Sequence, residues 1–300
     1  MAFMHFEYDI EPFALTAEQV LAARAADTGP RTTPLEPEHI SCERPGAMRL
    51  CVLGSGSKGN CSIVYTESGE AVMVDCGFSA RYTMKLLSQA GLDPGIIRAI
   101  VLTHEHNDHF KGVDVLSRKL DVPVYTAEGT AAVPKVAKLQ NVVPIHHRTR
   151  LALAGMDVTT FPTSHDAADP IGLRFDAEGD SLGYATDTGV LSEEGHELLA
   201  GCRILALESN HDPRMLKEGP YPSYLKRRIA GEQGHLSNAQ AQDVLDGLLD
   251  NPLSCVVGMH LSQVNNLPDI ARASLHGVVA RADHPAQVAV ANQGRILVVE

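Results

Sequence analysis

The sequence has no uninterrupted apolar run of about 18 residues or more, so it predicts no membrane-spanning helix. Its first residues, MAFMHFEYDIEP, lack the basic region and the apolar region of a secretory signal. Its six cysteines form no C-x-x-C pair, and several lie in apolar strand patterns, where a free cysteine acts as a small hydrophobe. Together these absences favour a protein of the reducing cytoplasm.

Positive charge is scarce, with 25 lysine and arginine residues against 37 aspartate and glutamate residues and a formal net charge of −12. A surface of this sign argues against broad, sequence-independent binding of nucleic acid. It leaves open a nucleic-acid substrate held at one site, where bound divalent cations would add local positive charge that the formal count omits.

The glycine-rich stretch LGSGSKGN (53–60) lacks the context of the two common phosphate-binding loops. Its glycines match G-x-G-x-x-G, but the dinucleotide fingerprint requires a helix next, and CSIVYT (61–66) is a strand pattern. The spacing of a P-loop around Lys58 is also absent. We therefore predict a hairpin here and no nucleotide cofactor.

Strand and helix patterns alternate from residue 49 to the end of the chain, and hairpins occur in both halves. A simple doubly wound parallel sheet has no hairpins, so we predict an α/β (α+β) fold with two mixed sheets and helices outside them. The helical patterns lie at 79–90, 111–119, 127–138, 192–200, 222–231, 238–249 and 268–280.

Residues 1–47 differ in character from the rest of the chain. Within them, TGPRTTPLEPEH (28–39) is rich in proline and threonine, which is typical of a linker. We therefore predict a poorly ordered N-terminal extension over 1–47 and a single folded domain over 48–300.

The strongest chemical signal is the run His104-Glu-His106-Asn-Asp108-His109, which follows the strand pattern AIVLT (99–103). Loops after strand ends commonly carry functional groups. Two histidines two positions apart can converge on one ion, and the Asp-His pair can serve a second ion beside it. Divalent metals accept imidazole nitrogen and carboxylate oxygen together, so the run predicts a metal site.

One loop cannot complete a site for two ions, and three other loops supply candidates. His165 follows the strand pattern DVTTF, Asp187 follows SLGYAT, and His260 follows SCVVGM. The carboxylate of Asp187 could bridge two ions. Each residue alone is a weak signal, but all three follow apolar strand patterns in the same way.

The order of these motifs over residues 49–300 resembles the metallo-β-lactamase superfamily, which implies an αββα four-layer sandwich and a dinuclear site. Lactamases usually carry cysteine where this chain has Asp187, and oxygen-reducing relatives carry a carboxylate where it has His106. The first difference argues against a lactamase, and the second favours hydrolysis over redox chemistry. The stretches most similar to YycJ-type hydrolases, which are related to metal-dependent nucleases and phosphodiesterases, are LGSGSKGNC, LESNHD (207–212), GHLSN (234–238) and MHLSQVNN (259–266).

The resemblance also implies roles for the candidate metal residues. Asp75 would orient a ligand from behind. The ions would be zinc or manganese, with iron as a further option. One ion would be held by His104, His106 and His165, and the other by Asp108, His109 and His260, with Asp187 between the two.

The implied reaction is attack of a metal-bridging hydroxide on a phosphodiester. The predicted catalytic residues are Asp108, His235 and Glu208. His235 would protonate the leaving oxygen under the guidance of Glu208, as in an analogous arrangement of related tRNA-processing nucleases. The alternative is that His235 merely packs beside the start of the helix at 238–249.

Two stretches are candidates for substrate binding. The glycine-rich loop would approach the phosphate and offer donors from Ser55, Ser57 and Asn60. The stretch YPSYLKRRI (221–229) combines the basic residues Lys226, Arg227 and Arg228 with Tyr221 and Tyr224, which suits contact with phosphates and stacking on bases. A solvated helix face is the alternative for this second stretch.

The function predicted from these features is a metal-dependent nuclease, and the resemblance favours a DNA exonuclease. A thioesterase of the glyoxalase II type would share the histidine-rich run, but its basic C-terminal region is missing, since 281–300 holds only Arg281 and Arg295 as cations. A small-molecule phosphodiesterase or a non-catalytic metal-binding module would also account for a metal site. The sequence says nothing about the oligomeric state.

Overall fold

The computed structural model describes residues 36–300, except residues 68 and 250–251. Most of the predicted N-terminal extension, residues 1–35, lies outside the described residues. Its last part differs from the prediction, because Glu38–Ile40 form strand β1, which pairs in parallel with strand β15 (Leu297–Val299). Within the described residues, regular structure therefore begins before residue 48. Strand β1 pairs with backbone groups at an edge of β15 that would otherwise be unpaired.

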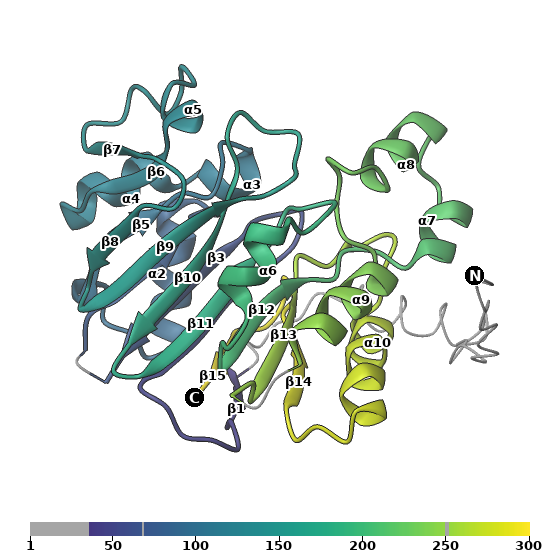
Figure 1. The fold of residues 1–300 in the computed structure, drawn as a ribbon. Coiled ribbons are helices and arrows are strands. Elements are labelled where there is room, and N and C mark those ends of the chain that lie inside the picture. Colours follow the sequence, from purple (N-terminus) through teal and green to yellow (C-terminus); the bar gives the residue numbers. More distant parts are fainter. Residues whose placement is uncertain (1–35, 68, 250–251) are drawn as a thin grey trace. The chain divides into compact units, whose positions relative to one another are not determined.

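Two mixed sheets form the centre of the described chain (Figure 1). In the first sheet β4 to β7 run parallel, and β15, β2, β3 and β4 pair antiparallel. Its order is β1, β15, β2 (Met48–Gly54), β3 (Cys61–Thr66), β4 (Ala71–Val74), β5 (Ile97–Val101), β6 (Val124–Ala127) and β7 (Val142–Ile145).

The second sheet combines a parallel half, β11 to β14, with an antiparallel half, β8 to β11. Its order is β14 (Gln287–Val290), β13 (Cys255–Met259), β12 (Ile204–Glu208), β11 (Asp180–Ala185), β10 (Ile171–Ala177), β9 (Met156–Pro162) and β8 (Arg150–Leu153). The antiparallel pairing of β2 and β3 around the glycine-rich stretch confirms the predicted hairpin.

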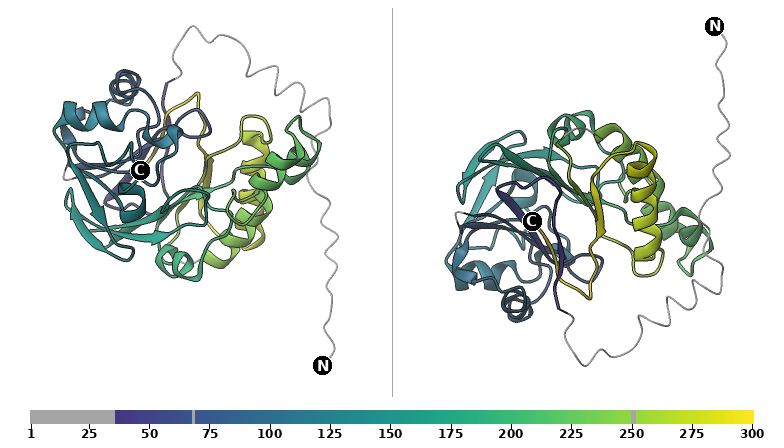
Figure 2. Two further views of the ribbon diagram at one scale, coloured as in Figure 1. Left: turned by 90° about the horizontal axis from the view of Figure 1, so that it is seen from above. Right: turned by 90° about the horizontal axis from the view of Figure 1, so that it is seen from below.

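Helices cover the outer faces of the two sheets, which confirms the predicted four-layer αββα sandwich (Figure 2). On the first sheet lie α2 (Ala80–Gln89), the 3-10 helix η1 (Pro94–Ile96), α3 (Asn107–Phe110), α4 (Val113–Leu120) and α5 (Glu128–Ala131). The second half of the chain contributes α6 (Glu193–Leu199), α7 (Pro213–Glu218), α8 (Ser223–Ile229), α9 (Asn238–Leu248) and α10 (Pro268–Arg281). None of the helices in the described residues has the length and apolar character needed to cross a membrane.

The central strands of both sheets are buried on both faces, and alternate residues of such a strand pack in different layers. In β2, Leu50 and Val52 pack between the two sheets, whereas Cys51 and Leu53 pack under the helices of the first sheet. This follows from the two-residue period of strands and explains why the strand patterns are almost continuously apolar.

Two local predictions differ from the structure. The helix expected over 127–138 ends at Ala131. Pro134 has no backbone N–H to donate and disfavours helical geometry at the residue before it. The short elements β7, β8, β14 and α7 were not predicted, because segments of this length carry too few residues to show a period.

Candidate metal centre

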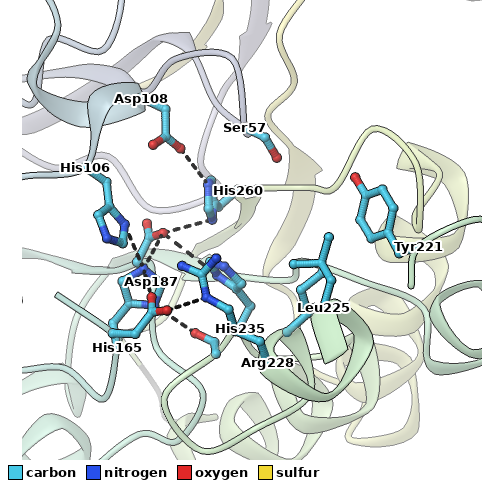
Figure 3. Close-up of a pocket in the computed structure, with 13 residues that line it drawn as sticks. Ser57, His106, Asp108, His165, Asp187, Tyr221, Leu225, Arg228, His235 and His260 are labelled. Atoms are coloured by element: carbon cyan, nitrogen blue, oxygen red, sulfur yellow. Dashed lines mark hydrogen bonds and ion pairs between the residues drawn. The ribbon is translucent and has the colours of Figure 1, made fainter. Parts of the chain in front are cut away.

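Loops at the ends of four strands, the end of β12 and the segment before α9 bring the predicted metal ligands and catalytic residues together in one place (Figure 3). The loop after β5 carries the histidine-rich run, and the loops after β9, β11 and β13 supply one residue each. Glu208 is the last residue of β12, and His235 lies in the segment before α9. Parallel strands end at the same edge of a sheet, which is why these distant segments meet.

Three strand-end residues of the centre have left-handed backbone conformations. The φ angles are 60° at Asp75, 56° at Asp187 and 54° at His260. Aspartate and histidine tolerate this region better than most residues, but each such position costs on the order of 1–3 kcal/mol. At each of these residues the side chains no longer alternate between the two faces of the sheet. The residue's own side chain points toward the other loops instead.

The first group of ligand atoms consists of three imidazoles, His104, His106 and His165, whose nitrogens lie within 4.8 Å of one another. His165 Nε2 is 3.3 Å from His106 Nδ1. His165 donates its other ring N–H to the carbonyl of Gly234 at 3.0 Å. That bond directs the lone pair of Nε2 into the centre, as the outer hydrogen bonds of metal-bound histidines do.

The second group consists of Asp108, His109 and His260. Asp108 Oδ2 lies 3.7 Å from His109 Nε2 and 3.6 Å from His260 Nε2. On the far side of its ring, His109 donates from Nδ1 to Asp75 at 2.7 Å. Asp75 in turn accepts from the backbone N–H of Thr103 at 2.8 Å, so it contacts the ring nitrogen of His109 that faces away from the centre.

Asp187 lies between the two groups. Its Oδ1 is 3.7 Å from His165 Nε2 and its Oδ2 is 3.4 Å from His109 Nε2. Oδ1 is also 3.3 Å from His260 Nδ1. The carboxylate therefore lies beside imidazoles of both groups, which is the position that a carboxylate shared between two ions would need.

The centre fits divalent cations. The buried atoms His104 Nε2, Asp187 Oδ2 and His260 Nε2 have no hydrogen-bond partner, although buried polar atoms are almost always paired. Although burial opposes it, the negative charges of Asp187 and Asp75 raise the pKa of His109 to about 9, so the site attracts positive charge. Burial and the neighbouring imidazoles lower the pKa of His104 well below its ordinary value, which favours the neutral form that binds metal.

Glu208 connects the second group of ligands with His235. Its Oε1 accepts from Nδ1 of His235 and from Nδ1 of His260, both at 2.9 Å. Its Oε2 accepts from the backbone N–H groups of Thr188 at 2.8 Å and Leu236 at 3.3 Å. Burial alone would raise the pKa of this carboxyl, but the contacts with His235 and His260 lower it below its ordinary range.

The contact between Glu208 and His235 agrees with the sequence prediction, whereas the contact with His260 was missed. Glu208 pairs with Met259 in the parallel register of β12 and β13, so the residue after Met259 starts its loop beside it. Glu208 and His260 each stand at the end of an apolar strand pattern, and this similarity was the signal in the sequence that could have indicated their contact.

Glu208→Gln is expected to lower both metal affinity and activity by roughly 10- to 100-fold, the usual effect of losing an outer partner of a ligand. A neutral amide can no longer accept from both imidazoles with the strength of a carboxylate. Titration calorimetry with zinc or manganese measures the affinity, and steady-state hydrolysis measures the rate. Glu218→Gln, at an exposed position on α7, is the control and should change neither. Unchanged metal affinity in Glu208→Gln would refute the bridging role.

A cavity of about 310 Å³ opens beside the centre. Metal-centre residues form one part of its wall, and the segment 221–229 forms another. His235 and Ser57 also line it. The side chain of His235 is 18% exposed, so it borders the cavity while Glu208 holds its Nδ1.

The glycine-rich loop meets the centre differently from the prediction, because only Ser57 of its three candidates lines the cavity. The hydroxyl of Ser55 is buried and accepts from the backbone N–H of His260 at 2.8 Å. Asn60 is also buried, and its amide oxygen accepts from the N–H of Gly56 at 2.7 Å. These two side chains therefore support the loops that carry the ligands.

The basic residues of α8 also separate in the structure. Arg228 lines the cavity and forms an ion pair with Asp166, another residue of its wall. Lys226 and Arg227 do not line it. Lys226 donates to the carbonyl of Lys217 at 2.7 Å, and Arg227 is exposed.

A buried asparagine network was missed by the sequence reasoning. Asn210 donates from its amide to the carbonyl of His260 at 2.7 Å, and its backbone N–H bonds the carbonyl of Leu236 at 2.9 Å. Asn266 donates to the carbonyl of Asn210 at 3.0 Å and to the side chain of Asn238 at 2.9 Å. The network fixes the loop of His260 against the segment of His235, and it accounts for the asparagines in LESN, GHLSN and MHLSQVNN.

Comparison with known proteins supports the same grouping. Residues 70–260 match the family model of the beta-lactamase superfamily domain. The chain is 34% identical over 238 residues to exodeoxyribonuclease YycJ of Bacillus anthracis, covering 77% of this chain and 89% of that protein. It is 32% identical over 241 residues to exodeoxyribonuclease WalJ of Streptococcus pneumoniae, covering 78% and 89%. These matches confirm the resemblance to YycJ-type proteins.

Solved structures agree on the fold. The metallo-β-lactamase fold protein YhfI of Bacillus subtilis superposes with a TM-score of 0.63 at 15% identity, covering 84% of this chain and 99% of that one. The short form of human tRNase Z superposes with a TM-score of 0.57 at 18% identity, covering 83% and 98%. With the two sheets, the convergent histidines and carboxylates and the matched family model, the chain belongs to the metallo-β-lactamase superfamily as a metal-dependent hydrolase.

Proposed function

We propose that this protein is an exonuclease that hydrolyses phosphodiester bonds of DNA with two divalent metal ions, zinc or manganese. The observation that carries the proposal is the pair of ligand groups that share Asp187. The similarity to exodeoxyribonucleases YycJ and WalJ over most of the chain supports DNA as the substrate.

Each ion has its own set of protein ligands in this proposal. When bound, two such ions lower the pKa of a water and neutralise charge that builds up on phosphate oxygens. Asp187 would lie between both positions, and Asp75 would keep the ring of His109 in place. One ion would be held by His104, His106 and His165, and the other by Asp108, His109 and His260.

His235 supplies the proton for the leaving oxygen. Glu208 accepts from its Nδ1, so Nε2 is the ring nitrogen left to face a substrate in the cavity. Imidazole suits this transfer because its ordinary pKa is close to neutral. Arg228 and Ser57 lie on the cavity wall, where their donors can contact phosphate oxygens of the same substrate.

Hydrolysis of an end-labelled DNA duplex by the purified protein with added manganese tests the proposal. We expect progressive shortening by the wild type and none by His106→Ala, because one imidazole of the first ligand group is lost. His146→Ala is the matched control, since the side chain of this histidine is 78% exposed and belongs to none of the ligand groups. If the wild type leaves DNA intact but cleaves a thioester or a small phosphodiester, the metal centre stands and the proposed substrate is wrong.

A further inference from the structure

The cavity has a second half that the metal chemistry does not use. Tyr221, Leu225 and Ile229 are spaced by four residues, and all three line it from the segment that contains α8. Figure 3 shows Tyr221 and Leu225 on the side of the cavity away from His106. The cavity therefore joins a polar, metal-binding wall to a wall with an aromatic ring and two aliphatic side chains.

The two tyrosines of YPSY have different environments. Tyr221 is partly buried at the cavity, whereas Tyr224 is 68% exposed and does not line it. An aromatic ring beside aliphatic groups offers a flat apolar surface, and α8 adds the guanidinium of Arg228, which is paired with Asp166. Flat apolar surface beside positive charge is the combination that recognises a base and its phosphate.

The size of the cavity limits what can occupy it. At about 310 Å³ it lies at the small end of the range for ligand pockets, which is roughly 300–1,000 Å³. One nucleotide is of that scale, and a base pair with two nucleotides is not. The cavity therefore has the scale of one nucleotide with its phosphate at the metal centre, entered without its pairing partner.

We propose that Tyr221, with Leu225 and Ile229, forms a subsite that stacks on the base of one unpaired nucleotide next to the scissile phosphate. The inference rests on the proposed DNA hydrolysis and adds how the substrate is held. Stacking uses the face of the base and not its edge, so the subsite accepts all four bases. For a duplex, the terminal pair must open before its nucleotide is cleaved.

A double-mutant cycle, in which one change is made at Tyr221 and the other in the substrate, tests the contact between this ring and the base directly. The substrates are two single-stranded oligonucleotides, one normal and one with an abasic residue at the terminus where degradation starts. The proteins are the wild type, Tyr221→Ala, Tyr221→Phe and the control Tyr224→Ala, all loaded with manganese. We expect kcat/KM on normal DNA to fall about tenfold or more in Tyr221→Ala, to fall less in Tyr221→Phe, which keeps the ring, and to stay close to wild type in Tyr224→Ala.

The abasic substrate provides the decisive comparison. It should slow the wild type about as much as the alanine substitution does, and it should slow Tyr221→Ala no further, because the same contact is already lost. Metal content and melting temperature confirm that each variant is folded. The comparison of normal and abasic DNA with the wild-type protein does not depend on the folding of any variant. Equal abasic effects in wild type and Tyr221→Ala would overturn the subsite but leave DNA hydrolysis in place. Absence of any DNA hydrolysis by the wild type would overturn both.

Discussion

Asp187→Ala is expected to lose metal from both positions and to lower DNA hydrolysis by on the order of 10³-fold or more. This carboxylate lies beside both ligand groups, at 3.7 Å from His165 of the first and at 3.3 and 3.4 Å from His260 and His109 of the second. Metal ions contribute several kcal/mol of transition-state stabilisation, and each 1.4 kcal/mol or so is a tenfold change in rate. Mass spectrometry of metal content per chain and the rate on end-labelled DNA are the two measurements.

Asp114→Asn is the matched control for Asp187→Ala. Asp114 lies on α4, belongs to none of the ligand groups, and forms an ion pair with Arg118. This variant should keep both metals. Full metal content with an undiminished rate in Asp187→Ala would show that the carboxylate is not shared between two ions.

His235→Ala is expected to keep both metals and to lower DNA hydrolysis by about 10²- to 10⁴-fold, the usual contribution of a general acid. In the proposed arrangement His235 is held by Glu208 and is not itself a ligand. DNA has a basic leaving oxygen that must be protonated as its bond to phosphorus breaks. The imidazole that supplies this proton is therefore required for DNA, and its loss leaves the ions in place.

A substrate with a better leaving group separates this role from a structural one. In bis(p-nitrophenyl) phosphate the leaving phenolate is stable without a proton, so His235→Ala should lose far less rate on it than on DNA. Metal content is measured on the same samples. Equal losses on both substrates, or loss of metal, would contradict a role in proton transfer. His146→Ala again serves as the control, at an exposed position outside the centre.

The four-layer fold was predictable because its signal is local. Strands such as β2 alternate between two apolar layers, and helices α9 and α10 show clear apolar faces. The candidate ligands were predictable for a similar reason, since four of them fall within the six residues 104–109 and the others follow strand patterns. Strand β1 was not, because three residues gain their structure only from pairing with β15.

The details of the centre depend on contacts between distant segments. Ser55 and Asn60 have side chains that can donate to phosphate. However, the hydroxyl of Ser55 is buried because it accepts from the backbone N–H of His260, 205 positions away. Glu208 reaches His260 as well as His235 because β12 and β13 are neighbours in the sheet. These contacts join segments that are far apart in the chain, so the sequence around each residue does not predict them.

The segment 221–229 shows the same division between local pattern and tertiary contact. Leu225 and Ile229, four residues apart, lie on one side of α8, and Tyr221 lies just before the N-cap of this helix. Which side meets the cavity depends on how α8 is seated beside the metal centre, where Arg228 pairs with Asp166. The helical period is a property of the backbone, whereas the choice of face follows from packing against residues far away in the chain.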